Sequence, residues 1–394
     1  QLVEENKLDL HTPIAKYLPN YPREVAEKVT IHHLLVHSAG IPNFVSFRKF
    51  YSENSRDHFS PEQFVKVYAD STLQFIPGTK FRYSNSNYFL LGYLLEEVTG
   101  KTYQQLLQDY IFDPLKMVNT GYDNHQTILK KRASGYEKVG LSYVNANYLD
   151  MSIPYAAGAL YSTVEDLFLW NIALAENKLV SKQTKELIFK PHISTGKRNY
   201  GYGWSVGYEQ IEGKKDSIDV IDHGGAIDGF HTFITRIPEN GQFIVLLNNT
   251  GKTYLPEMNK AIRQILYNAE YENPRQSLTT LLAETLAKGG IKKAEEFYSA
   301  HKNDENTLLS EGEMNALGYA LLAEKKNDEA ICIFKLAADA FPLSANVFDS
   351  LGEGYFYNEA YELSLKNYQK ALRLGGTGGS AKRMIEKIEA ILQK

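Results

Sequence analysis

The 394-residue sequence contains a single cysteine, Cys332, and this scarcity excludes an internal disulfide framework. No apolar run approaches the roughly 20 residues that cross a bilayer, so we expect no membrane span. Basic residues are not in excess, because 43 Lys and Arg face 47 Asp and Glu, for a formal net charge of -4. Since no Lys/Arg run is interleaved with aromatics, nucleic acid is not an expected partner.

Apolar and aromatic residues are plentiful, at 43% and 12% of the chain, which is ample for large buried cores. The length favours two domains. In residues 1–272, some segments have apolar residues at helical spacing and others have them at every second position. After Asn273-Pro274 the apolar residues recur at helical spacing throughout. We therefore predict an α+β domain at 1–272, with helices beside an antiparallel sheet, and an all-α domain at 273–394. The predicted strands lie at 201–208, 217–222, 229–237 and 242–247.

The first candidate site residues lie in the segment 77–100, where a Pro-Gly turn precedes Tyr83-Ser84-Asn85 and a helix that Gly100 can end. Residues two apart in an extended stretch face the same side, so Tyr83 and Asn85 can project together into a cleft. A phenol can transfer protons, and a carboxamide can orient a substrate. The alternative is that both side chains only cap the helix.

A second candidate lies between two predicted strands, where His223 precedes Gly224 and Gly225. Two glycines let a strand edge approach a ligand closely, because no Cβ intervenes. The alternative is a glycine bulge beside a packed histidine.

Two further histidines, His33 and His37, are four residues apart in a short predicted helix that Thr30 can cap and Gly40 can end. This spacing is compatible with a metal, but no Glu stands in the thermolysin-type position and no third ligand is evident. We expect ordinary hydrogen-bonded histidines there, with no metal and no cofactor.

The stretches 30–40, 77–100 and 222–230 together resemble the signatures of serine beta-lactamase and penicillin-binding-protein-like hydrolases, which include class C beta-lactamases, family VIII esterases and D-aminopeptidases. The resemblance implies a beta-lactamase-like fold and a periplasmic or secreted location. It implies an acyl-enzyme reaction on an ester, a D-amino-acid amide or peptide, or a beta-lactam, without a cofactor. The implied catalytic residues are Tyr83, Asn85 and His223, and the implied substrate-binding and oxyanion residues are Gly224, Gly225 and Ala226.

Two details bear on the reaction. Many lactam-directed members carry lysine where this chain has His223, so the resemblance favours esters or D-amino-acid amides.

The family nucleophile and its base form a Ser-x-x-Lys motif. The matches in this chain are about as frequent as chance gives: Ser46/Lys49, Ser194/Lys197 and Ser299/Lys302.

The chain starts at Gln1 in what reads as the last turn of a helix. We therefore expect the nucleophile helix and the N-terminal strands to lie upstream of Gln1, so that this chain alone is inactive. The alternative is a catalytically dead scaffold whose helical part binds other proteins.

Residues 311–378 resemble tetratricopeptide repeats. Gly318 and Phe334 in the first repeat correspond to Gly352 and Tyr368 in the second, 34 residues further along. The resemblance implies paired helices that either bind a peptide partner or pack against the catalytic domain.

Overall fold

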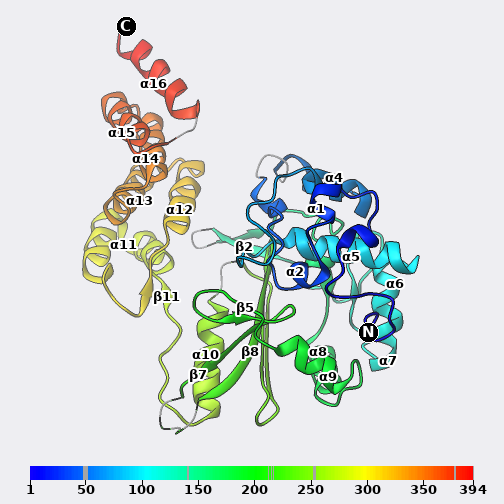
Figure 1. The fold of residues 1–394 in the computed structure, drawn as a ribbon. Coiled ribbons are helices and arrows are strands. Elements are labelled where there is room, and N and C mark those ends of the chain that lie inside the picture. The colour runs from blue at the N-terminus through cyan, green and yellow to red at the C-terminus, as the bar shows by residue number, and fades with distance from the viewer. Residues whose placement is uncertain are drawn as a thin grey trace. The chain divides into compact units, whose positions relative to one another are not determined.

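The computed structural model describes residues 1–47, 52–139, 142–211, 213, 215, 217–251, 254–376 and 379–393. The chain forms two compact units (Figure 1). The first contains Gln1–Gly135 and Ala146–Tyr271, and the second contains Tyr136–Asn145 and Glu272–Lys394. The second unit therefore includes, besides the C-terminal helices, a hairpin from the middle of the chain that the sequence pattern did not place there.

A six-stranded antiparallel sheet forms one layer of the first unit (Figure 1). This sheet confirms the predicted α+β class, because period-two segments pair by short turns such as the one at Asn240-Gly241. Its order is β10 (Gln242–Asn248), β9 (Phe230–Ile237), β8 (Ile218–Ile227), β7 (Ser205–Glu209), β6 (Asn199–Tyr200) and β5 (Ile193–Ser194).

Strand β8 is longer than its neighbour β7. Residues Ile218 to Asp222 pair with β7, whereas residues 223–227 pair with β9 alone. In this register Gly224 lies opposite Phe233, and Ala226 lies opposite His231. The end of β8 that carries the predicted site residues therefore extends beyond β7.

Two helices pack against β9 and β10, the two strands at one edge of the sheet. Helix α8 (Val164–Ala175) contacts β10, and α10 (Leu255–Leu266) contacts mainly β9. Buried polar contacts fix α10 there: Thr235 donates to Asn259 Oδ1 at 2.9 Å, and Arg263 donates to Glu209.

The central helix of the remaining part of the first unit is α5 (Asn85–Thr99), which packs against α2 (Ile31–Leu35), α4 (Pro61–Ala69), α6 (Tyr103–Leu107) and η4 (Tyr155–Ala157). The core of this part is mostly aliphatic, and it contains a cluster of buried aromatic rings around Phe89. Gly92 allows η4 to approach, because a Cβ at this position would lie 2.4 Å from the Cβ of Ala156.

The other elements of this unit are short. Strand β1 (Gly121–Tyr122) pairs with β4 (Leu160–Tyr161). The short helices are η1 (Ile14–Lys16), α1 (Arg23–Ala26), η2 (Phe44–Ser46), η3 (Gln108–Phe112), α7 (Asp113–Leu115) and α9 (Lys182–Phe189).

The second unit consists mainly of antiparallel helix pairs, with α13 packed on α12, and α15 on α14. Gly318 lets Phe334 approach α12, and Gly352 does the same for Tyr368 on α14, as predicted from their spacing. The assignment to tetratricopeptide repeats stays a prediction. The helices are α11 (Leu278–His301, kinked at Gly290), α12 (Glu311–Ala323), α13 (Asn327–Ala340), α14 (Ala345–Tyr357), α15 (Tyr361–Arg373) and α16 (Gly379–Leu392).

Two small strand pairs complete the second unit, the hairpin β2 (Tyr136–Val139) with β3 (Ser142–Asn145) and the parallel pair β11 (Gln276–Ser277) with β12 (Thr307–Leu308). Over the part of the chain that the structure describes, no helix is both long enough and apolar enough to cross a bilayer.

Candidate active site

The site is built where the chain after α2 runs beside the segment that leads into α5. Helix α2 starts at the predicted cap Thr30 but ends at Leu35, well before Gly40, and His37 adopts a left-handed φ of 54°. The main chain then bonds to the later segment: Arg82 donates to the carbonyl of His37 at 2.9 Å, and Gly78 donates to that of Ser38 at 2.8 Å. These bonds place His37 beside Tyr83.

The start of α5 differs from the prediction in one respect. Ser84 is the N-cap residue, with extended backbone, and Asn85 is already the first helical residue. The cap side chain makes no capping hydrogen bond among the described residues, and two distant side chains accept the N–H groups instead. Ser84 donates to His37 Nδ1 and Asn85 to Asn43 Oδ1, both at 3.2 Å. Tertiary contacts, more than local capping, therefore fix this helix end.

The ring of Tyr83 packs on the imidazole of His37, with ring centroids 4.1 Å apart, and Tyr88 and Tyr200 flank the same imidazole at 5.1 and 5.2 Å. His37 is 1% exposed, whereas Tyr83 is 42% exposed. The phenol of Tyr83 can therefore meet a ligand while its ring stays anchored. Partial burial raises the pKa of Tyr83, so its phenol is neutral at pH 7.

His223, on β8, lies at the same place, with its ring centroid 6.1 Å from that of Tyr83. Its Nε2 shares a 2.9 Å hydrogen bond with the hydroxyl of Tyr200. Burial lowers the pKa of His223, and the carboxylate of Asp222 only partly opposes this. The structure thus brings together two of the predicted residues, Tyr83 and His223, from distant parts of the chain.

Gly224, Gly225 and Ala226 continue β8 past the end of β7 and are exposed. Because successive residues of an antiparallel strand point their N–H groups to opposite sides, some of these groups face an edge that β7 does not cover. A Cβ on Gly225 would lie 2.6 Å from Oγ1 of Thr232. A larger residue here would therefore clash with β9, so this glycine is needed for cross-strand packing as well as for the predicted close approach of a ligand.

Two residues that support His223 were missed by the sequence analysis. Tyr200 holds the imidazole, and Arg198 forms an ion pair with Asp222 while also donating to the carbonyl of Val220 at 2.6 Å. Tyr200 lies on β6 and Arg198 lies just before that strand, so their approach to β8 depends on the register of the sheet, and no local motif marks it.

His33 and His37 accept hydrogen bonds from the main chain, as predicted. The Nδ1 of His33 accepts from the N–H of Thr30 at 3.2 Å, which completes the cap of α2.

The Ser-x-x-Lys matches do not form a buried nucleophile pair in the described residues. Ser194 and Lys197 are exposed near the turn between β5 and β6. Ser299 is exposed on α11 of the second unit, and Lys302 forms an ion pair with Asp339 at 2.9 Å. The remaining match, Ser46/Lys49, includes Lys49, which lies outside the described residues.

The buried His37 predicts a pH dependence of stability. Burial, assisted by the nearby His223, lowers its pKa from 6.5 to about 3. Between these values the unfolded chain binds a proton that the folded chain does not, so stability falls as the pH drops from 6.5. We expect this residue to lower the free energy of unfolding by about 1.6 kcal/mol between pH 6.5 and 5, because the slope approaches about 1.4 kcal/mol per pH unit only once the unfolded histidine is mostly protonated.

Urea unfolding at pH 5.0, 6.5 and 7.5 measures this dependence. The matched variant is His37→Asn, since asparagine tolerates left-handed backbone but does not titrate in this range. The variant should be less stable at pH 7.5 and should lose less stability on acidification than the wild type. Equal losses in both proteins would exclude His37 as the responsible group.

Residues 1–267 match the family model described as Beta-lactamase. The chain is 28% identical over 270 residues to the putative penicillin-binding protein PbpX of Bacillus subtilis (strain 168), covering 68% of this chain and 62% of the relative. It is 31% identical over 196 residues to the teichoic acid D-alanine hydrolase of Staphylococcus aureus, covering 49% and 44%.

Among solved structures, a D-stereospecific amidohydrolase from Streptomyces sp. superposes with a TM-score of 0.56 at 25% identity, covering 64% of this chain and 77% of that one. The chain spans less than two thirds of the length of the curated relatives described above.

Proposed function

This chain belongs to the beta-lactamase family, and from that premise we propose that its first unit performs serine-hydrolase chemistry through an acyl-enzyme on an ester or amide. One observation carries the proposal: the partly exposed phenol of Tyr83 and the imidazole of His223 lie side by side, with ring centroids 6.1 Å apart. The two side chains come from different elements, and the exposed end of β8 continues directly from His223.

In the proposed reaction a serine hydroxyl attacks the substrate carbonyl, and its proton passes through Tyr83 to the leaving group. Water then attacks the acyl-enzyme, which releases the acid and restores the serine. Because the pKa of Tyr83 is raised by burial, a nearby cation such as the family lysine is needed to make the phenol an effective base. We assign the nucleophilic serine and this lysine to none of the described residues.

The other predicted residues receive supporting roles. The N–H of Ala226, in the exposed extension of β8, would stabilise the oxyanion. Asn85, at the first turn of α5 and half-buried, would orient the substrate amide or the lysine. His223 would contact the leaving group.

The charge state of His223 favours esters or D-amino-acid amides over beta-lactams. Burial lowers its pKa, so the imidazole is neutral at pH 7 and offers no full positive charge to the carboxylate of a beta-lactam. Similarity to a teichoic acid D-alanine hydrolase and to a D-stereospecific amidohydrolase supports the same choice.

A substrate comparison tests the proposal. The full gene product, with whatever residues flank these 394, is assayed with a p-nitrophenyl ester, D-alanine amide and nitrocefin, and L-alanine amide is the stereochemical control. We expect ester and D-amide hydrolysis, with an acyl adduct visible by intact-protein mass spectrometry. Faster turnover of nitrocefin would contradict the substrate class, and no turnover of any compound would favour a non-catalytic scaffold.

For the second unit, we propose that the helix pairs bind a peptide segment of a partner protein. The observation in favour of repeats is the recurrence of a glycine–aromatic contact, Gly318 with Phe334 and Gly352 with Tyr368. A periplasmic or secreted location is likewise a proposal, and it rests on family resemblance.

A further inference from the structure

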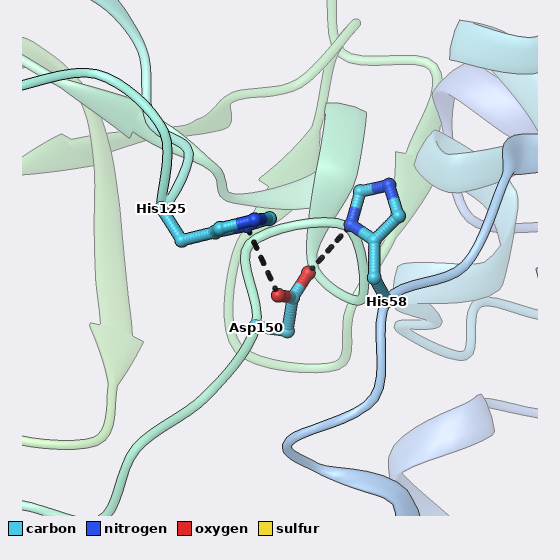
Figure 2. A group of neighbouring side chains, drawn as sticks. All are labelled: His58, His125 and Asp150. Carbon is cyan, nitrogen blue, oxygen red and sulfur yellow. Dashed lines mark hydrogen bonds and ion pairs between the residues drawn. The ribbon is translucent and has the colours of Figure 1, made fainter.

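Three side chains with metal-binding atoms meet in the first unit, and none of them is among the residues assigned to the proposed reaction. His58 precedes α4, His125 lies in the loop after β1, and Asp150 precedes η4. One potential ligand atom from each residue lies within 4.8 Å of those of the other two. Figure 2 shows both imidazoles turned toward the carboxylate, one on each side.

The carboxylate is the fixed member of this cluster. Asp150 is 4% exposed, its Oδ1 accepts the N–H of Ser152 at 3.0 Å, and its own N–H donates to the carbonyl of Ser55 at 2.8 Å. The hydroxyl of Tyr148 lies 3.5 Å from Oδ2. Such outer contacts orient a metal-binding carboxylate and hold it in place.

The histidines approach different oxygens of this carboxylate. The Nδ1 of His58 lies 3.2 Å from Oδ1, and the Nδ1 of His125 lies 3.7 Å from Oδ2. The ion pairs of Asp150 in the described part of the chain are to these two imidazoles, and no Lys or Arg is paired with it there. Among the described residues, the possible charge partners of this nearly buried carboxylate are thus the two imidazoles, which are titratable and can bind a metal.

The spacing is close to that of a zinc site. With bonds of about 2.0 to 2.1 Å to nitrogen and oxygen, the ligand atoms of a tetrahedral site lie roughly 3.3 Å apart. The two imidazoles approach different oxygens, so a set with one ligand atom per residue contains at most one of the contacts of 3.2 and 3.7 Å, each of which is close to this value. Any other pair in that set lies within 4.8 Å and would need to close by about 1.5 Å at most. The side chains of His58 and His125 are 64% and 48% exposed, so small rotations of either ring can supply that closure.

We propose that His58, His125 and Asp150 bind one Zn²⁺, with water completing the coordination. Two imidazoles and one carboxylate favour a first-row transition metal over Mg²⁺ or Ca²⁺, which prefer all-oxygen sites. The ion would tie together three segments that are distant in the sequence, 55–59, 123–127 and 148–152. The proposed ligands include none of the residues assigned to the hydrolase chemistry, and neither proposal depends on the other.

Metal titration of the tag-free protein, stripped with a chelator, tests the site. We expect calorimetry with ZnCl₂ and metal analysis to give one Zn²⁺ per chain, undisturbed by millimolar Mg²⁺ or Ca²⁺. Hydrogen exchange should slow in 55–59, 123–127 and 148–152 when Zn²⁺ is added, and elsewhere it should change little. Failure to retain Zn²⁺, or displacement by Mg²⁺, would overturn the proposal.

The deciding variant is His58→Ala/His125→Ala, because these exposed side chains can be removed with little risk to folding. We expect its zinc affinity to fall by at least about 100-fold, on the scale of losses seen on weakening metal sites. The matched control is His301→Ala, which removes an imidazole from α11 and should bind Zn²⁺ like the wild type. Undiminished binding by the double variant, with circular dichroism showing a folded chain, would reduce the cluster to a hydrogen-bonded His–Asp–His group.

Discussion

Replacing Tyr83 with Phe is expected to lower kcat/KM of the full gene product for its ester or amide substrate by about 10²- to 10⁴-fold. The substitution removes only the hydroxyl that we propose transfers the proton. The ring remains, and so does its contact with His37, whose centroid lies 4.1 Å away. The thermal unfolding midpoint should therefore change little, although kcat/KM falls strongly.

The matched control for this experiment is Tyr208→Phe, which removes a phenolic hydroxyl from a side chain on β7 that is 75% exposed. Its kcat/KM should equal that of the wild type. A wild-type rate in Tyr83→Phe itself would mean that the phenol takes no part in proton transfer, and the assignment of the site would fail.

The second large effect is on stability. Phe89→Ala is expected to lower the free energy of unfolding of the first unit by about 3 to 5 kcal/mol, as large-to-small changes at buried aromatic residues do. Phe89 is fully buried on α5, and its ring centroid lies 4.6 Å from that of Phe64 and 4.8 Å from that of Tyr155. Truncation leaves a cavity that these rings cannot fill without moving α4 or η4.

Urea unfolding followed by near-ultraviolet circular dichroism measures this loss, and Phe168→Ala is the control. Phe168 lies on α8 and is 50% exposed, so its truncation should cost no more than about 1 kcal/mol. Similar losses in the two variants would show that the aromatic cluster around Phe89 does not dominate the stability of the first unit.

The sequence predicted those parts of the fold that depend on neighbouring residues. The period of two and the Asn240-Gly241 turn indicated the antiparallel sheet, because the alternation of side chains in a strand is a local property. Thr30 was recognised as the cap of α2 for the same reason. The fold class and the family membership were therefore accessible from the chain alone.

The helix ends near the site were not predictable in this way. We expected α2 to continue as far as Gly40 and Asn85 to be extended, whereas α2 stops at Leu35 and Asn85 begins α5. The reason is that side chains from a different segment, on His37 and Asn43, accept the N–H groups at the start of α5. Such bonds depend on tertiary structure, which local patterns do not encode.

The same limit applies to side chains that meet only in the folded protein. His58, His125 and Asp150 have no shared spacing that would indicate a cluster, and the contact between Tyr200 and His223 requires the sheet register. The roles of Tyr83, Asn85, His223, Gly224, Gly225 and Ala226 stay predictions until the variants are assayed.

Helix α5 begins at Asn85 and carries Phe89 about one turn later. Evolutionary change at this helix is therefore constrained. Substitutions at the N-terminus of α5 that alter reactivity also disturb the packing around Phe89, and substitutions that restore the packing move the N-terminus. Directed evolution toward a new substrate should therefore select its first beneficial substitutions in other segments, where one residue does not affect both the site and the core.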